Sequence, residues 1–181
     1  MVTLVHLNGP SGAGKSTLAQ RYVDEHQGVL NLDIDMVVSL IGGWRNNFFA
    51  TVSLARDIAV AMAETHLRNG IDVVMPQLVT SAAQAEQFEQ AARRADATYV
   101  EVALMVDPNE QIRRFRMKAQ ESDVSSEVER AVDAEGGDAV LTRIHQQFTE
   151  YLAARQSVLL LDVSRDAEQS YRALRQALTR R

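Results

Sequence analysis

The feature that most constrains this chain is a glycine-rich stretch close to its N-terminus. Its nine residues fit the pattern G-x-x-x-x-G-K-[ST] and are Gly9, Pro10, Ser11, Gly12, Ala13, Gly14, Lys15, Ser16 and Thr17. A β-prone run at residues 2–7 precedes the stretch, and apolar residues at helical spacing follow it. A strand, a glycine turn and a helix in this order let backbone N–H groups converge on an anion. The stretch therefore predicts a phosphate-binding loop.

Two side chains of this loop have chemical roles that follow from their types and positions. Lys15 is expected to contact the β- and γ-phosphates of a nucleoside triphosphate, and the Ser16 hydroxyl to ligate Mg²⁺. A chance glycine turn between a strand and a helix is the alternative, but it requires neither the lysine nor the hydroxyl. We therefore expect a nucleoside triphosphate and Mg²⁺ to bind here.

The rest of the chain alternates between strand-like and helix-like patterns. Further strands are predicted at residues 29–32, 71–75, 98–106 and 158–161. Helices are predicted at residues 51–68, 81–95, 138–155, from 108 and from 166 onwards, with a short helix or turn at 36–41. This alternation predicts an α/β fold, in which a five-stranded, mostly parallel sheet is covered by helices on both faces.

The length of 181 residues suits a single domain, residues 1–181. Residues 120–138 are polar, mostly acidic and interrupted by two glycines, so we expect an exposed, mobile segment there. Together with the basic run before it, this segment is expected to form a mobile lid over residues 113–140. Ligands of such sheets bind beyond the carboxyl ends of the strands, so the functional side chains are expected there.

Two acids follow the second predicted strand. Asp35 is favoured as the group that accepts a proton from an acceptor hydroxyl or holds Mg²⁺ through water, and Asp33 shares its face if the strand stays extended. The alternative is that one of them only caps the helix that starts near Met36. Gln77 follows the third strand and could contact a substrate, but its neighbourhood offers no acid for a second Mg²⁺ ligand.

Arginines supply the remaining candidates. Arg113 and Arg116 are three residues apart on a predicted helix, so both can face a transferred phosphoryl group, with Arg114 a weaker candidate. Arg45 and Arg56 could bind an acceptor substrate. For each of these residues the alternative is an ordinary solvated arginine.

Composition excludes several other kinds of site. The chain contains no cysteine, which rules out disulfides and thiolate metal sites, and its histidines form no metal-binding pair. Its net charge of −5 argues against a broad nucleic-acid surface. No leader-like segment and no apolar run near the roughly 18 residues of a membrane span are evident, so we expect a cytoplasmic protein. No heptad pattern is evident in the sequence, so the sequence does not indicate an oligomeric state.

In its glycine loop, its Asp33-Ile34-Asp35 strand end and its arginine helix before a polar lid, the chain resembles the small P-loop kinases. This group of AAA-type ATP-binding proteins includes nucleoside monophosphate kinase-like proteins, gluconate kinase, the chloramphenicol phosphotransferase group and the zeta-toxin-like ATPases. The resemblance implies strand order 2-3-1-4-5, ATP as the donor, Mg²⁺, and a small hydroxyl- or phosphate-bearing acceptor.

The resemblance also implies roles for individual residues. Asp35 matches the acid that activates an acceptor hydroxyl, Arg113 and Arg116 match lid arginines near the adenine and the phosphates, and Arg165 lies in a loop near the adenine. The predicted function is an ATP-dependent small-molecule kinase, in which Lys15, Asp35 and Arg116 are catalytic. The alternatives are a nucleotide-binding module that senses or sequesters a ligand and, less favoured, a nucleic-acid end kinase.

Overall fold

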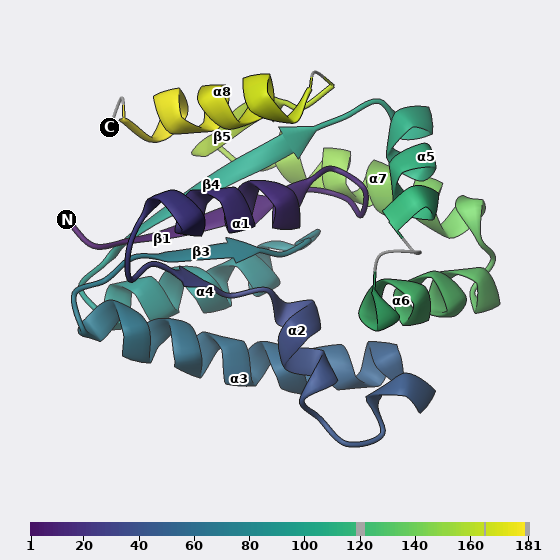
Figure 1. Cartoon of the computed structure of the whole chain (residues 1–181), viewed down its shortest axis with the longest axis horizontal. Helices are drawn as coiled ribbons and strands as arrows, with labels where there is room; N and C mark the ends of the chain where they lie inside the picture. The colour runs from purple at the N-terminus through teal and green to yellow at the C-terminus, as the bar shows by residue number, and fades with distance from the viewer. Residues whose placement is uncertain (119–121, 165, 180–181) are drawn as a thin grey trace.

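Five parallel strands form one sheet in the order β2-β3-β1-β4-β5 (Figure 1). The computed structural model describes residues 1–118, 122–164 and 166–179. The strands are β1 (Thr3–Asn8), β2 (Leu30–Asn31), β3 (Val73–Pro76), β4 (Thr98–Met105) and β5 (Val158–Asp162). The predicted α/β class and strand order are therefore confirmed, with every strand pair parallel.

Helices cover both faces of this sheet. They are α1 (Lys15–Glu25), α2 (Ile34–Ser39), α3 (Phe48–Arg68), α4 (Ala82–Arg94), α5 (Pro108–Lys118), α6 (Asp123–Ala134), α7 (Asp138–Ala153) and α8 (Ala167–Thr179), with a short 3-10 turn η1 (Trp44–Asn46). Figure 1 shows α1 and α8 on one side of the sheet and α3 and α4 on the other. Within the described ranges, no helix is both long and apolar enough to cross a membrane.

The central strand β1 explains why the sheet is enclosed on both faces. Leu4 and Leu7 are fully buried and belong to different cores, Leu4 to the one beneath α3 and α4 and Leu7 to the one beneath α1 and α8. Successive side chains of a strand point to opposite faces, so a strand that has buried apolar side chains on both faces needs cover on both. The crossover helices provide that cover.

The helix after β2 begins earlier than its sequence pattern predicts. Asp33 is its N-cap, because one carboxylate oxygen accepts a hydrogen bond of 3.0 Å from the Asp35 backbone N–H. Asp35 consequently lies in the first turn of α2 rather than at the end of an extended strand. Of the two acids, Asp33 is the one that caps the helix.

The expectation of an exposed segment over residues 120–138 is wrong for its central part. Residues 123–134 form α6, which Ser122 caps by accepting a 3.1 Å hydrogen bond from the Ser125 N–H. Glu127 and Val132 are buried, because one face of the helix packs against α5 and α7. The polar composition concealed an amphipathic helix, and whether it moves as a lid stays a prediction.

Candidate functional site

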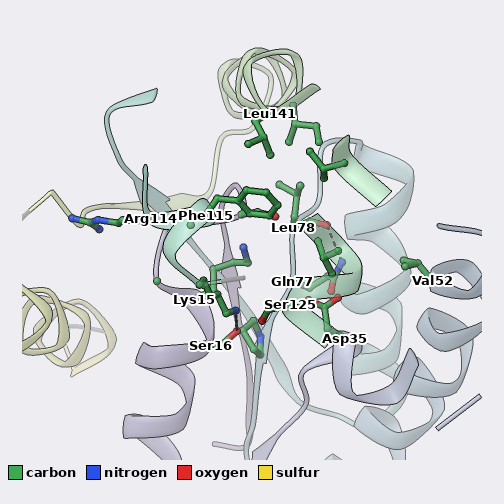
Figure 2. A pocket seen from close by; sticks show the side chains of 18 of the residues that line it. Lys15, Ser16, Asp35, Val52, Gln77, Leu78, Arg114, Phe115, Ser125 and Leu141 are labelled. Carbon is green, nitrogen blue, oxygen red and sulfur yellow. Dashed lines mark hydrogen bonds between the residues drawn. The ribbon is translucent and has the colours of Figure 1, made fainter. Parts of the chain in front are cut away.

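A cavity of about 530 Å³ lies at the carboxyl end of the sheet. The glycine loop, α2, α3, the segment after β3, and helices α5, α6 and α7 all contribute to its wall. Figure 2 shows Lys15 and Ser16 on one side of it and Asp35 on the other, with Leu78, Phe115 and Leu141 above. The cavity thus lies where ligands of parallel α/β sheets are expected.

The backbone conformation and close packing of the loop require glycine at position 12. Its φ is +91°, and a Cβ at this position would collide with the carbonyl oxygen of Gln111 in α5. At the loop's end, Gly14 is the N-cap of α1 with a φ of 89° and offers no capping side chain. The first N–H groups of α1 therefore lack a side-chain acceptor, which is the arrangement that binds phosphate at a helix N-terminus.

Lys15 lies folded against its own loop. Its Nζ donates to the carbonyl oxygens of Gly9 at 2.8 Å and Pro10 at 3.0 Å. Burial of the ammonium group, followed by repulsion from Lys118, lowers the pKa of Lys15 to about 8. A phosphate group bound here would place a negative charge beside this ammonium group and favour its charged form.

Lys118 is a functional candidate that the sequence reasoning missed. It lines the cavity from the end of α5, and its Nζ lies 3.5 Å from the Ser16 hydroxyl. The reasoning considered only the arginines of this helix. The available signal was helical spacing, because Lys118 is four residues after Arg114, which also lines the cavity.

Ser16 and the two acids after β2 form a set of oxygen donors. The Ser16 hydroxyl donates to a carboxylate oxygen of Asp33 at 2.9 Å, so Asp33, which the sequence analysis ranked below Asp35, contacts the predicted metal ligand. Burial and repulsion from Asp33 raise the pKa of Asp35 to about 6. Asp35 itself lines the cavity.

This donor set fits Mg²⁺. Magnesium prefers oxygen ligands, keeps several waters, and is usually held by one or two carboxylates plus substrate phosphates. A cation here would relieve the repulsion that raises the pKa of Asp35. The described residues contain no cluster of three or more acidic, histidine or cysteine side chains arranged to hold a metal, so the remaining ligands would be phosphate oxygens and water.

The structure separates the two arginines that were predicted to act together. Arg113 lines the cavity and makes two 2.7 Å hydrogen bonds to Glu110. Arg116 is not among the cavity-lining residues, and its guanidinium instead binds carboxylates of α6 and α7, namely Glu129, Asp133 and Asp138. Its position connects helices, and its predicted catalytic role stays a prediction.

Arg114 has a third arrangement. Its side chain extends away from the centre of the cavity (Figure 2) and donates to the Val163 carbonyl at 3.0 Å and to Glu110 at 2.7 Å. It ties α5 to the segment after β5. Arg165, predicted to lie near the adenine, falls outside the described residues.

Of the residues predicted to bind the acceptor, some line the cavity and one lies outside it. Arg56 and Gln77 line the cavity, from α3 and from the segment after β3. Arg45 does not: it pairs with Asp123 at 3.1 Å and stacks over the ring of Trp44 at 4.6 Å. The structure therefore brings Arg56 and Gln77 to the site and leaves Arg45 outside the cavity.

The segment after β3 is held in place by two side chains from β1. Asn8 accepts from the Val79 N–H at 2.8 Å and donates to the Val79 carbonyl at 3.0 Å. His6 donates through Nε2 to the Gln77 carbonyl at 2.8 Å, which leaves Nδ1 to accept from the Tyr99 hydroxyl at 2.6 Å. Burial is the main cause that lowers the pKa of His6 and favours this neutral form.

Apolar side chains close the cavity above the phosphate loop. The sequence analysis named none of them as part of a site, although those of α6 and those of α7 recur at helical spacing. They are Val128 and Val132 of α6, Leu141 and Ile144 of α7, and Phe115 and Met117 of α5. This wall can exclude water from a phosphoryl group during transfer.

Comparison with known proteins agrees with this geometry. A family model described as an AAA domain matches residues 4–140. No curated protein matches the chain. A candidate kinase from Chloroflexus aurantiacus J-10-fl superposes with a TM-score of 0.72 at 16% identity, over 98% of this chain and 96% of that one.

Two further solved structures have the same fold. A gluconokinase from Sinorhizobium meliloti 1021 has a TM-score of 0.64 at 14% identity, covering 99% of this chain and 92% of that one. A deoxyadenosine kinase from M. mycoides has a TM-score of 0.59 at 9% identity, covering 98% of this chain and all 100% of its own. At these identities the likeness concerns the fold, which is that of the P-loop kinases.

Proposed function

The chain belongs to the AAA domain family, and from this premise we propose that it is an ATP-dependent kinase that phosphorylates a hydroxyl group of a small molecule. The observation that carries the proposal is the position of Asp35. This carboxyl group has a raised pKa and lines the same cavity as Lys15 and Ser16. A general base close to a phosphate loop is the arrangement that phosphoryl transfer to a hydroxyl requires.

Each residue of the site has a part in this transfer. The backbone N–H groups of the loop and the ammonium groups of Lys15 and Lys118 bind the β- and γ-phosphates and stabilise the charge on the transferring group. Asp35 takes the proton of the acceptor hydroxyl, the acceptor oxygen bonds to the γ-phosphorus, and the bond to the β-phosphate oxygen breaks to release ADP. Ser16 and Asp33 would hold Mg²⁺, which supplies charge neutralisation when it is bound.

The closing wall supports the same reaction. Water that reaches the γ-phosphate competes with the acceptor, so a kinase benefits from an apolar cover. Leu141 and Phe115 provide this cover above Lys15 (Figure 2). Gln77, on the segment after β3, offers the acceptor a neutral hydrogen-bonding partner instead of a second acid.

The test measures ADP formed from Mg²⁺-ATP with and without pooled small hydroxyl compounds. We expect ADP formation that depends on the acceptor and disappears in Lys15→Ala, whose folding is checked by thermal denaturation. Dividing the active pool then identifies the substrate. ADP formed at one slow rate whatever is added would instead support a nucleotide-binding module, and stimulation only by 5′-hydroxyl oligonucleotides would support a nucleic-acid end kinase.

A further inference from the structure

One arginine in the wall of the cavity has no partner among the residues that the structure describes. Arg56 makes no hydrogen bond or ion pair with any residue that the structure describes, and its Nε atom is buried without an acceptor. It lines the cavity from α3 and is about half-buried. Its side chain is therefore neither free in solvent nor neutralised by the protein.

Arg56 differs in this respect from the other half-buried arginines of the described ranges. Each of those holds a carboxylate at 2.5 to 2.7 Å; they are Arg21, Arg114, Arg116 and Arg155. Among the half-buried arginines of the described ranges, Arg56 is thus the one without a carboxylate partner, although Arg114 lines the same cavity.

An unpaired guanidinium in this position has an energetic cost. Burial lowers the pKa of Arg56, and the nearby charge of Asp57 opposes that effect only in part. Guanidinium groups nonetheless stay charged at physiological pH, so the group keeps its charge and lacks an anion. Taking a charge out of water without a counter-charge is unfavourable, and a bound anion would relieve the cost.

The position of Arg56 assigns this anion to the acceptor rather than to the nucleotide. Arg56 follows Val52 by one helical turn, so both lie on one face of α3. Figure 2 shows Val52 on the far side of Asp35 from Lys15 and Ser16. Helix α3 also packs against α2, which carries Asp35.

The surroundings of Arg56 describe the rest of the ligand. Phe48, Phe49 and Val52 line the cavity from the first turns of the same helix. Phe49 is 50% exposed, so its apolar surface is accessible to a ligand in the cavity. A ligand that pairs with Arg56 would therefore place an apolar part against these side chains.

We infer that the acceptor is an anionic hydroxyl compound with an apolar part, whose carboxylate or phosphate pairs with Arg56 while its hydroxyl faces Asp35. The position of the hydroxyl rests on the proposed function. The pairing of the anion with Arg56 does not, because it follows from the unpaired charge in the cavity wall.

Calorimetric titration with matched probes tests this inference. The protein is first saturated with Mg²⁺ and a non-hydrolysable ATP analogue, so that the phosphate loop is filled. Mandelate is compared with mandelamide, and thymidine monophosphate with thymidine, because each pair differs only in the anionic group. We expect at least one anion to bind about tenfold or more tightly than its neutral partner, as a charge-assisted pair predicts.

Variants then assign the preference to one residue. Arg56→Gln is expected to abolish the preference for the anion and leave affinity for the ATP analogue unchanged, whereas Arg56→Lys retains part of it. Arg68→Gln is the matched control, because Arg68 lies on the same helix but is exposed and paired with Glu64. Without ligand, Arg56→Gln is expected to raise the melting temperature, because it removes an unpaired half-buried charge.

Two results would overturn the inference. One is a preference for the anion that survives in Arg56→Gln, and the other is failure of both anions to bind the wild type at about 10 mM, far weaker than a specific site allows. Failure of the proposed function is distinguishable, since an anion could bind through Arg56 while no acceptor accelerates ADP formation. Conversely, acceptors that accelerate ADP formation equally well with or without an anionic group would overturn only the inference.

Discussion

The carboxyl group of Asp35 makes the site sensitive to pH. Its pKa is raised to about 6 by burial and by the neighbouring Asp33, while the two lysines of the site oppose the shift. A general base works best when its pKa lies near the working pH. At the scale of single residues, Asp35 therefore determines under which conditions transfer can occur.

We expect kcat/KM to rise with pH and to reach a plateau above about pH 6, because only the ionised carboxylate can take the acceptor's proton. A bound cation shifts this rise in kcat/KM to lower pH, because it lowers the pKa of the carboxyl group. Asp35→Asn should lower kcat by about 10²- to 10⁴-fold, the usual contribution of a general base, with little effect on ATP affinity. Initial rates measured between about pH 5 and 8 test this. If Asp35→Asn showed the same rise of kcat/KM with pH, Asp35 would not be the general base.

The same shift predicts an effect on stability. Because the folded-state pKa lies above the ordinary aspartate value of 3.8, Asp35 stabilises the fold only while it is protonated. That stability is fully present below pH 3.8 and is lost as the pH rises through about 6. Without ligand, Asp35→Asn should therefore have a melting temperature a few degrees higher than the wild type at neutral pH and no difference near pH 4. Differential scanning calorimetry of both proteins at the two pH values tests this. A lower melting temperature at neutral pH would show that the carboxylate is stabilised instead.

At the scale of elements, the ion pairs of Arg116 connect the phosphate side of the cavity to its apolar cover. One guanidinium reaches carboxylates of α6 and α7 at 2.7 to 3.0 Å, and α6 contributes Ser125, Val128 and Val132 to the cavity wall. Single exposed ion pairs contribute about 1 kcal/mol or less, but here three share one arginine. Helix α5 can in this way hold α6 over the phosphate loop.

Arg116→Gln separates a positioning role from the predicted catalytic one. If Arg116 positions α6, amide hydrogen exchange over residues 123–134 should accelerate, KM for ATP should rise, and kcat should fall less than about tenfold. Arg130→Gln is the control, because Arg130 lies on α6 and its ion pair, among the described residues, is with Glu127 of the same helix. A fall in kcat of about 100-fold or more with unchanged exchange would instead favour direct contact with the transferring phosphoryl group.

At the scale of the whole molecule, a buried polar network joins strands β1 and β4 of the sheet to helix α7. Glu101 of β4 is 1% exposed and binds Asn8 of β1 at 2.7 Å, the Tyr151 hydroxyl of α7 at 3.0 Å and Arg155 at 3.1 Å. Asn8 in turn holds Val79 in the segment that lines the cavity. The network therefore links global stability to the geometry of the acceptor side.

Glu101→Gln should destabilise the protein strongly. A buried hydrogen bond to a charged group contributes about 1.5 to 3 kcal/mol, and Arg155 keeps its pair with Glu89 in this variant. We therefore expect a loss of about that size, which lowers the melting temperature by roughly 5 to 10 °C. We also expect faster amide exchange over residues 77–81. Glu86→Gln, at an exposed position on α4, is the control and should change the free energy of unfolding by about 0.5 kcal/mol or less. A loss in Glu101→Gln no larger than in this control would mean that the network contributes little.

The sequence by itself determined those structures that residues close together in the chain form without distant partners. The phosphate loop is a local structure, because its glycines, its lysine and the helix that follows are contiguous and their backbone conformations need no distant partner. The alternation of strands and helices likewise predicted the parallel sheet, whereas its strand order was implied by the resemblance to the small P-loop kinases. The choice between Asp33 and Asp35 was harder, because both follow one strand and only contacts made in the fold distinguish them. Asp33 caps α2 and accepts from Ser16, whereas Asp35 lines the cavity.

The tertiary structure alone decided which distant side chains meet. Lys118 reaches Ser16 across 102 positions of sequence, and the acids of α6 and α7 draw Arg116 away from the cavity. Side chains that share a helical stripe separate when their partners lie on different elements, and no spacing rule reveals those partners. The missing partner of Arg56 is of the same kind, because a charge can be recognised as unpaired only when everything packed around it is known.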